Sequence, residues 1–244
     1  MMTELKLKEP FKKTIADFID GLKKIYVDDL ISVILYGSAA SNEFSEHFSN
    51  LNLLVILKNT GLGSLKKVTG LVNHPKFRII QPLFLTEDYI NKSLDVFPIE
   101  FIDMQENYSL LYGKDILKGI NVDTKNLRFQ CEQELKVKLI NLKQQYLKIS
   151  RDDKRGLSLL LYKNFTSLVH LLRNMLRLKG KPVPYLKEEI LQSFSAEFKI
   201  DTTTLKRILD LKNNPKKVTL GEILVLLDNF VIELERIIAI IDEL

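Results

Sequence analysis

Apolar residues in the first half of the chain alternate between helical and extended spacing. A helix is predicted to begin at Pro10, because proline is favoured in a first helical turn and apolar side chains then recur three and four residues apart. The apolar face of this helix comprises Phe11, Ile15, Phe18, Leu22 and Ile25. Two nearly continuous apolar runs, residues 31–36 and 51–57, predict strands buried on both faces of a sheet.

The same alternation continues to about residue 104. It predicts a helix over residues 66–72, a third strand over 77–85 and a short helix over 86–94. A fourth strand is predicted around Ile99, Phe101 and Met104, with Pro98 at its start, where a missing N–H group is tolerated. We therefore expect an α/β domain with a mixed sheet.

The apolar period changes to 3.6 residues in the second half. The first long helix has an apolar face made of Leu127, Cys131, Leu135, Leu139, Leu142 and Tyr146. This spacing makes Cys131 a small core residue rather than a nucleophile. The next helix, residues 157–178, is apolar on more than one face, which is typical of the central helix of a bundle.

The remaining helices are shorter or have clear boundaries. Two are predicted over residues 186–198 and 203–211, and Thr219 with Glu222 forms a capping box that starts the last helix. These features predict an all-α helical bundle of about five helices. The expected domains are an α/β domain over residues 1–125 and a helical bundle domain over residues 126–244.

Composition restricts the class of protein. A chain of 244 residues that is 45% hydrophobic can bury a substantial core. No basic leader with an apolar core is present at the start, and the apolar stretch 220–244 carries charged side chains such as Glu222, Asp228 and Arg236, so we expect a cytoplasmic protein with no membrane partner. One cysteine and three scattered histidines predict neither an internal disulfide nor a structural metal.

The formal net charge of +5 comes from the second half of the chain. Basic residues gather in two groups there, which are Lys148, Arg151, Lys154 and Arg155, and then Arg173, Arg177, Lys179 and Lys181. Such groups can attract a nucleotide or a nucleic acid. Aromatic residues are not interleaved as a base-stacking surface requires, so a solvated lysine-rich surface is the favoured interpretation and nucleic acid is not an expected partner.

The most informative segment is LYGSAASNEFSEHFSNLNLLVIL, residues 35–57. A strand ends in Gly-Ser, a polar loop follows, and Ser-x-x-x opens the next apolar strand. This arrangement resembles the nucleotidyltransferase superfamily, in which Gly-Ser is followed by Ser-Asp-x-Asp at the head of the neighbouring strand. The resemblance implies a nucleotidyltransferase-like fold and a nucleoside triphosphate as the bound partner.

The family chemistry assigns roles to the matching positions. A glycine lets the backbone approach a triphosphate, and alternate aspartates on one strand project to the same side, where they hold Mg²⁺. By this resemblance, Gly37, Ser38 and Ser49 are the candidate nucleotide-binding residues.

The sequence departs from the family at the metal-binding positions. Asn50 and Asn52 stand where the resemblance places the two aspartates. An amide oxygen supplies no negative charge, and losing two charges about 4 Å from a divalent ion removes several kcal/mol at an effective dielectric near 20. The sequence therefore predicts no bound metal and a catalytically inactive protein, with Mg²⁺ as a cofactor only if a rearranged site is active.

Other acids are candidates for such a rearranged site. Glu100, in the predicted fourth strand, is the candidate remnant of the third carboxylate, and the alternative is an ordinary, partly exposed strand residue. Asp103 is predicted to start a turn. Glu43 and Glu46 lie in the Gly-Ser loop and have a weaker claim.

The resemblance extends to antibiotic nucleotidyltransferases, in which a helical bundle follows the catalytic half. It is carried by FPIEFIDMQENYSLLYGKDIL and the basic helical region that follows. In such relatives, bundle residues contribute to the substrate pocket or to a dimer. Three functions are therefore expected to compete: a catalytically inactive nucleotide-binding protein, an active transferase with a rearranged metal site, and a homodimeric interaction scaffold.

Overall fold

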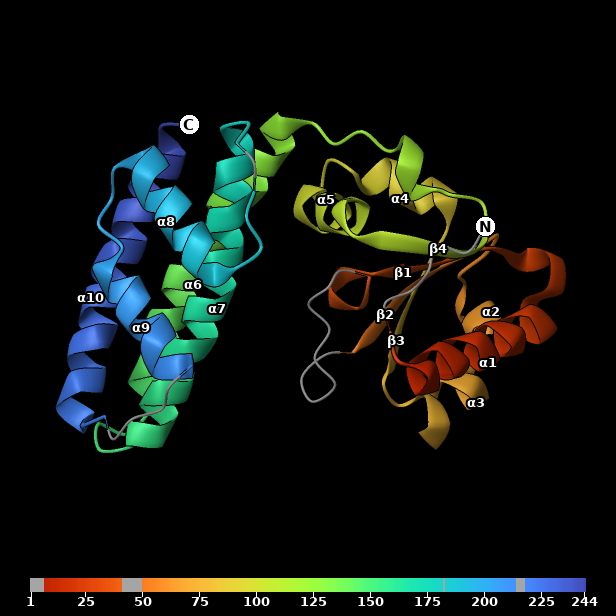
Figure 1. Cartoon of the computed structure of the whole chain (residues 1–244), viewed down its shortest axis with the longest axis horizontal. Helices are drawn as coiled ribbons and strands as arrows, with labels where there is room; N and C mark the ends of the chain where they lie inside the picture. The colour runs from red at the N-terminus through yellow and green to blue at the C-terminus, as the bar shows by residue number, and fades with distance from the viewer. Residues whose placement is uncertain (1–6, 41–49, 182, 214–217) are drawn as a thin grey trace. The chain divides into compact units, whose positions relative to one another are not determined.

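The computed structural model describes residues 7–40, 50–181, 183–213 and 218–244 (Figure 1). Within it the chain divides into two compact units, Met1–Asp123 and Thr124–Leu244. The first contains a sheet with helices on both faces, and the described residues of the second form helices and their connections. None of the described helices combines the length and the apolar content that crossing a bilayer requires.

A four-stranded mixed sheet organises the first unit. Its order is β3-β2-β1-β4, with strands β1 (Leu30–Tyr36), β2 (Leu51–Leu57), β3 (Ile80–Leu85) and β4 (Tyr108–Gly113). Strand β2 runs parallel to β3, whereas β1 runs antiparallel to both of its neighbours. The prediction of a mixed sheet is confirmed. Strands β1 and β2 are central, which explains why their sequences are almost continuously apolar.

Helices cover both faces of this sheet. One face packs against α1 (Glu9–Tyr26), and the other packs against α4 (Glu87–Ser93) and α5 (Pro98–Glu106). The short helices α2 (Leu62–Lys66) and α3 (Thr69–Val72) lie between β2 and β3 in sequence. Because successive strand residues point to opposite faces, Leu53 and Val55 join the α1 side while Leu54 and Ile56 join the α5 side.

The predicted strand around residues 99–104 is wrong, because this segment is helix α5. Pro98 occupies the first turn of that helix, a position as favourable for proline as the start of a strand. Phe101 and Met104 are three residues apart, so they share one helical face and bury it against the sheet. Asp103 consequently lies within a helix and does not start a turn. The fourth strand is β4, which begins at Tyr108.

Two other boundaries differ from the sequence-based prediction. The segment 66–72 belongs to two short helices, α2 and α3, rather than to one. The third strand begins at Ile80, because Pro75 starts a single 3-10 turn that runs to Phe77. The turn takes up Phe77, the first residue of the predicted strand, which accounts for part of the later start.

The described part of the second unit contains five helices. They are α6 (Thr124–Lys148), α7 (Lys154–Leu178), α8 (Lys187–Phe198), α9 (Thr203–Asn213) and α10 (Leu220–Asp242). Helix α7 contacts each of the other four, as its apolar residues on several faces predict. Cys131 is fully buried in α6, and Thr219 and Glu222 form the predicted capping box of α10.

A carboxyl group is buried within this bundle. Glu233 of α10 is 6% exposed, and its Oε2 atom has no hydrogen-bond partner among the described residues. Burial is the main cause that raises its pKa, with Asp201 adding to the rise and hydrogen bonds from Thr204 opposing it. The contribution of Glu233 to the free energy of unfolding is therefore most favourable below the unfolded-state pKa. It becomes less favourable as the pH rises through the folded-state pKa.

We therefore expect Glu233→Gln to stabilise the protein by about 1 kcal/mol at pH 7.5, because a neutral amide is cheaper to bury than a carboxylate. The gain should disappear near pH 4, where the carboxyl is protonated in both states. Thermal unfolding at the two pH values measures this, with Asp228→Asn as an exposed control on the same helix. An equal gain at both pH values would show that charge burial is not the cause.

Candidate functional site

The candidate site begins at the turn that follows strand β1. Gly37 has φ +75°, a left-handed conformation that favours glycine, and it starts a 3-10 turn that ends at Ala39. Its N–H group donates to the carbonyl oxygen of Asn107 at 3.1 Å, and its own carbonyl accepts from the N–H of Ala40 at 2.9 Å. These bonds hold the Gly-Ser turn against the start of β4.

Asn52 lies directly beside this turn. A Cβ atom on Gly37 would be 3.3 Å from the Nδ2 atom of Asn52, so the glycine leaves room for the amide. Asn52 is opposite Tyr36 in the pairing of β1 with β2, and Tyr36 is opposite Tyr108 in the pairing of β1 with β4. Opposed residues of neighbouring strands share a face, so the three side chains form a row across the strand ends.

Asn50 precedes the first residue of β2 and is exposed, while Asn52 is partly buried. The main chain between them is fixed by the N–H of Leu51, which donates to the carbonyl of Ile79 at 2.9 Å. Residues two apart in an extended segment project to the same side. The structure thus places both asparagines at the strand end that adjoins the Gly37 turn.

Of the other two predicted nucleotide-binding residues, Ser38 lies among the described residues and Ser49 does not. Ser38 follows Gly37 in the turn and is partly buried. Ser49 lies outside the described residues, as do Glu43 and Glu46. The roles of Gly37, Ser38 and Ser49 in nucleotide binding remain predictions.

Glu100 is exposed in the first turn of α5. Its predicted place in a strand is wrong, because the segment is helical. Its neighbour Phe101 packs against the sheet face formed by Ile34, Leu54 and Ile56. Glu100 therefore belongs to a helix on the same side of the sheet as Asn52, and its role as a third carboxylate remains a prediction.

The site is rich in neutral polar groups. Burial raises the pKa of the Tyr36 phenol. Burial also raises the pKa of Tyr108, and its phenol donates to Oδ2 of Asp115 at 3.0 Å. No group of three or more His, Cys, Asp or Glu side chains in the described part of the chain is arranged to hold a metal ion. Phenol and amide groups at this strand end can donate hydrogen bonds to an anionic oxygen.

Sequence reasoning missed three contributors to this site, namely Tyr36, Asn107 and Tyr108. Tyr36 immediately precedes Gly37, so its place in the motif was a usable signal. Asn107 and Tyr108 come from the segment that joins α5 to β4. Their contribution depended on where the fourth strand begins, and the sequence-based prediction placed that strand too early.

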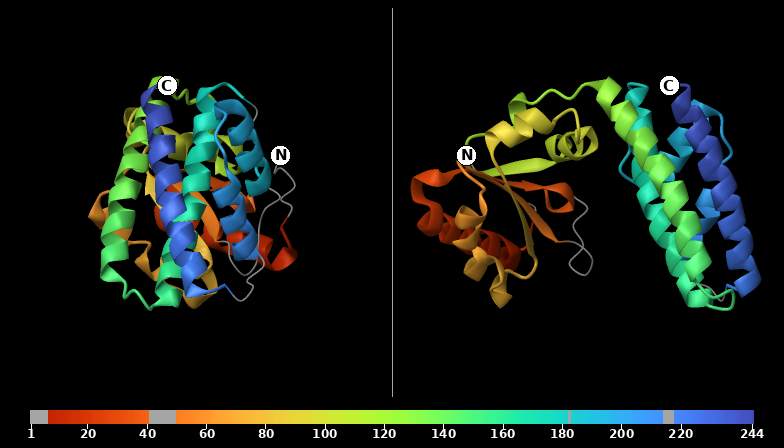
Figure 2. Two further views of the ribbon diagram at one scale, coloured as in Figure 1. Left: turned by 90° about the vertical axis from the view of Figure 1, so that its left-hand side faces the viewer. Right: turned by 180° about the vertical axis from the view of Figure 1, so that it is seen from behind.

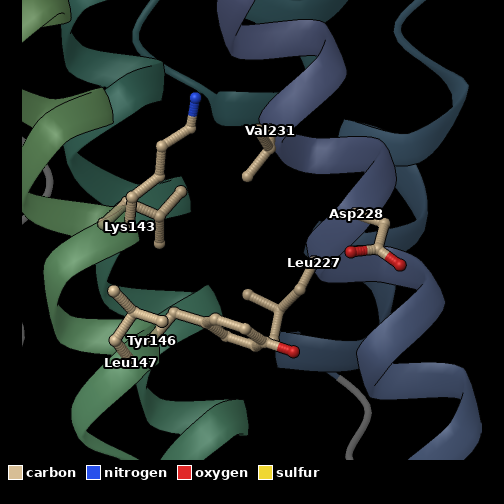
Figure 3. A pocket seen from close by; sticks show the side chains of 7 residues that line it. Lys143, Tyr146, Leu147, Leu227, Asp228 and Val231 are labelled. Carbon is tan, nitrogen blue, oxygen red and sulfur yellow. The ribbon is translucent and has the colours of Figure 1, made fainter.

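The helical unit contains a separate cavity of about 220 Å³ between α6 and α10 (Figure 3). Its lining residues are mostly apolar and comprise Leu142, Lys143, Tyr146, Leu147, Leu227, Asp228 and Val231. The ammonium of Lys143 is paired with Glu235 at 2.8 Å. This volume is below the range usual for small-molecule sites, and its only cation already has a carboxylate partner, so the cavity is a poor candidate for a nucleotide.

The two predicted basic groups are structurally different. Lys148, Arg151, Lys154 and Arg155 are all exposed near the α6–α7 turn, consistent with a solvated surface. In the second group, the guanidinium of Arg173 lies 4.4 Å from the ring centre of Tyr185, and Lys181 is paired with Glu197 at 3.2 Å. Arg177 donates to the side-chain oxygen of Asn174.

Comparison with known proteins supports the fold. The sequence matches no protein family, and no curated protein shows significant similarity to it. The structure is similar to spectinomycin adenyltransferase AAD(9) from Enterococcus faecialis, solved with ATP and spectinomycin, with a TM-score of 0.55 and 12% sequence identity. The similarity covers 90% of this chain and 99% of that chain. The chain therefore shares the fold of that structure, and its α/β domain is followed by a helical bundle, as the sequence predicted.

Proposed function

We propose that this chain binds a nucleoside triphosphate at the Gly37 turn without a divalent metal and does not transfer a nucleotidyl group. The observation that carries the proposal is the position of the Asn52 amide, next to a left-handed glycine that opens the backbone. The likeness to an adenyltransferase solved with ATP supports a nucleotide as the ligand. A glycine without a Cβ permits the close backbone approach that a phosphate group needs.

The chemistry of Asn50 and Asn52 favours direct contact with phosphate. A carboxylate at either position would repel a triphosphate unless a cation lay between them. An asparagine amide instead provides two N–H donors to phosphate oxygens. Asparagine in place of aspartate thus removes the need for a metal to bind the phosphates. It also removes the negative charge that two-metal catalysis requires.

The described donors do not fit a magnesium site. Mg²⁺ in nucleotide enzymes is usually held by one or two carboxylates together with phosphate oxygens. The described side chains of the row at this strand end are an amide and two phenols, and the acid that contacts the row, Asp115, accepts a hydrogen bond from Tyr108. No catalytic step through a metal is therefore assigned to this chain.

The proposal predicts ATP binding that depends on the glycine turn. A fluorescent ATP analogue should bind the protein in EDTA, and Gly37→Val should weaken binding at least tenfold, because a branched side chain cannot adopt this φ and would crowd Asn52. Gly70→Val is a control, since a Cβ there meets nothing within 4 Å. Unchanged binding in Gly37→Val would exclude this turn as the site.

The active-transferase alternative makes a different prediction. It requires pyrophosphate release from a nucleoside triphosphate that depends on Mg²⁺ or Mn²⁺ and is lost in Glu100→Gln. Our proposal expects no such release from the unmodified protein. Metal-dependent release that the Glu100 variant abolishes would replace the proposal with the rearranged-site enzyme.

A homodimeric scaffold is a second candidate function. Exposed apolar side chains on α6 and α10 favour it, because large apolar side chains in water commonly mark a protein-binding surface. They include Leu147, which is 82% exposed, together with Ile140 and Val225. A dimer in analytical ultracentrifugation that dissociates in Leu147→Glu would support this function, and a monomer would argue against it.

A further inference from the structure

Two lysines in the helical unit are held by hydroxyl groups rather than by acids. Lys138 of α6 donates from Nζ to Oγ of Ser167 at 2.6 Å, and Lys212 of α9 donates from Nζ to Oγ1 of Thr166. Thr166 and Ser167 are consecutive residues of α7, so their Cα atoms are about 3.8 Å apart. Helix α7 contacts both α6 and α9, and the left-hand view of Figure 2 shows it between them.

The hydroxyl protons are already used within α7. Thr166 donates to the carbonyl oxygen of Tyr162 at 2.8 Å, and Ser167 donates to those of Lys163 and Asn164 at 3.2 and 3.1 Å. Each hydroxyl therefore accepts from its lysine. An ammonium group has three N–H donors, so each lysine retains two for another acceptor.

In the described part of this unit, other lysines are paired with acidic side chains, unlike Lys138 and Lys212. Lys136, Lys143 and Lys181 each form an ion pair with a glutamate. Among the described residues, neither Lys138 nor Lys212 forms an ion pair with a carboxylate. An ammonium that is partly buried without a counter-ion is costly, and a bound anion would reduce that cost.

The electrostatic surroundings agree with this geometry. Burial is the main cause that lowers the pKa of Lys212, and the positive charge of Lys187, at the start of α8, lowers it further. Burial also lowers the pKa of Lys138, with Glu134 acting in the opposite direction. The ammonium groups of Lys138 and Lys212 thus contact one stretch of α7, with the charge of Lys187 near Lys212 and that of Glu134 near Lys138.

We propose that Lys138 and Lys212 form an anion-binding site on α7 that takes the oligophosphate group of a small molecule. The two lysines reach side chains of successive α7 residues, which point about 100° apart around the helix axis, so an anion that contacts both must present oxygens that lie several ångströms apart. A chain of phosphate groups does this, whereas a single phosphate reaches one lysine. Neither Lys138 nor Lys212 belongs to the basic groups evident from the sequence, and this site does not depend on the Gly37 turn.

The test is calorimetric titration of the full-length protein with inorganic tripolyphosphate in EDTA at low salt. We expect binding that weakens as salt is added, and a loss of about tenfold for each of Lys138→Gln and Lys212→Gln. Lys206→Gln, an exposed lysine of α9, is the matched control and should bind as the unmodified protein does. Lys138→Arg with Lys212→Arg keeps the charges and should retain binding, which separates charge loss from misfolding.

Several outcomes would overturn the inference. They are no binding of tripolyphosphate at low salt, an equal loss in Lys206→Gln, and loss of tripolyphosphate binding in Gly37→Val, which would place the anion at the glycine turn instead. Tighter binding of a single-stranded oligonucleotide, with the same dependence on Lys138 and Lys212, would reassign the surface to nucleic acid. If tripolyphosphate binding is retained in Gly37→Val and lost in the lysine variants, the anion site on α7 is supported even when the nucleotide proposal fails.

Discussion

Replacing Asn50 and Asn52 together with aspartate should increase the affinity for Mg²⁺ in the presence of ATP by at least a hundredfold. Each carboxylate adds a charge about 4 Å from the ion, which is worth several kcal/mol at an effective dielectric near 20. In EDTA the same variant should bind ATP more weakly than the unmodified protein, because two carboxylates then face the triphosphate without a cation. Calorimetry of Mg²⁺ and of ATP measures both effects.

The matched control adds the same charge elsewhere in the first unit. Asn73 and Asn91 are both exposed, so their double replacement by aspartate keeps the net charge of the test variant. It should change neither Mg²⁺ affinity nor the effect of EDTA on ATP binding. An unchanged Mg²⁺ affinity in the Asn50/Asn52 variant would mean that the strand end no longer has the geometry of a metal site.

Gly113→Ala should destabilise the protein by about 3 kcal/mol or more. Gly113 ends β4 with φ +78°, and a Cβ there would be 1.9 Å from the carbonyl oxygen of Ile31. That oxygen accepts from the N–H of Lys114 at 3.3 Å, so the strands would have to separate where β4 pairs with β1. Strain in the left-handed region and a steric clash both contribute.

Urea unfolding measures this change as a lower midpoint with an unchanged slope. Gly70→Ala is the control, because its Cβ would meet nothing within 4 Å and its φ is ordinary. A Gly113→Ala midpoint equal to that of the control would show that β4 can move away from Ile31 at little cost.

The central strands were predictable because burial on both faces gives a distinctive sequence. Residues 31–36 and 51–57 are almost entirely apolar, and the structure places them in the middle of the sheet. Strand β4 lies at an edge and has several partly exposed side chains, so its sequence carries a weaker signal. The preceding segment, which also carries closely spaced apolar residues, was taken for the strand, although it forms α5.

The candidate site was predictable only where it depends on consecutive strands. Gly37 and Asn52 end and begin neighbouring antiparallel strands, so their proximity follows from the order of the sequence. The contribution of Asn107 requires the position of β4. Lys138 and Lys212 are 74 residues apart by their numbers, and only the packing of α6 and α9 against α7 brings them to adjacent hydroxyls.

The most direct test of the proposed function is isothermal calorimetry of the purified protein with ATP, GTP, CTP and UTP, each with Mg²⁺ and with EDTA. The account predicts that at least one nucleotide binds and that its affinity is retained in EDTA, because amide and backbone donors replace the metal. Binding that EDTA abolishes would contradict this account and favour a metal-dependent transferase, and no heat with any nucleotide would contradict it in favour of a scaffold.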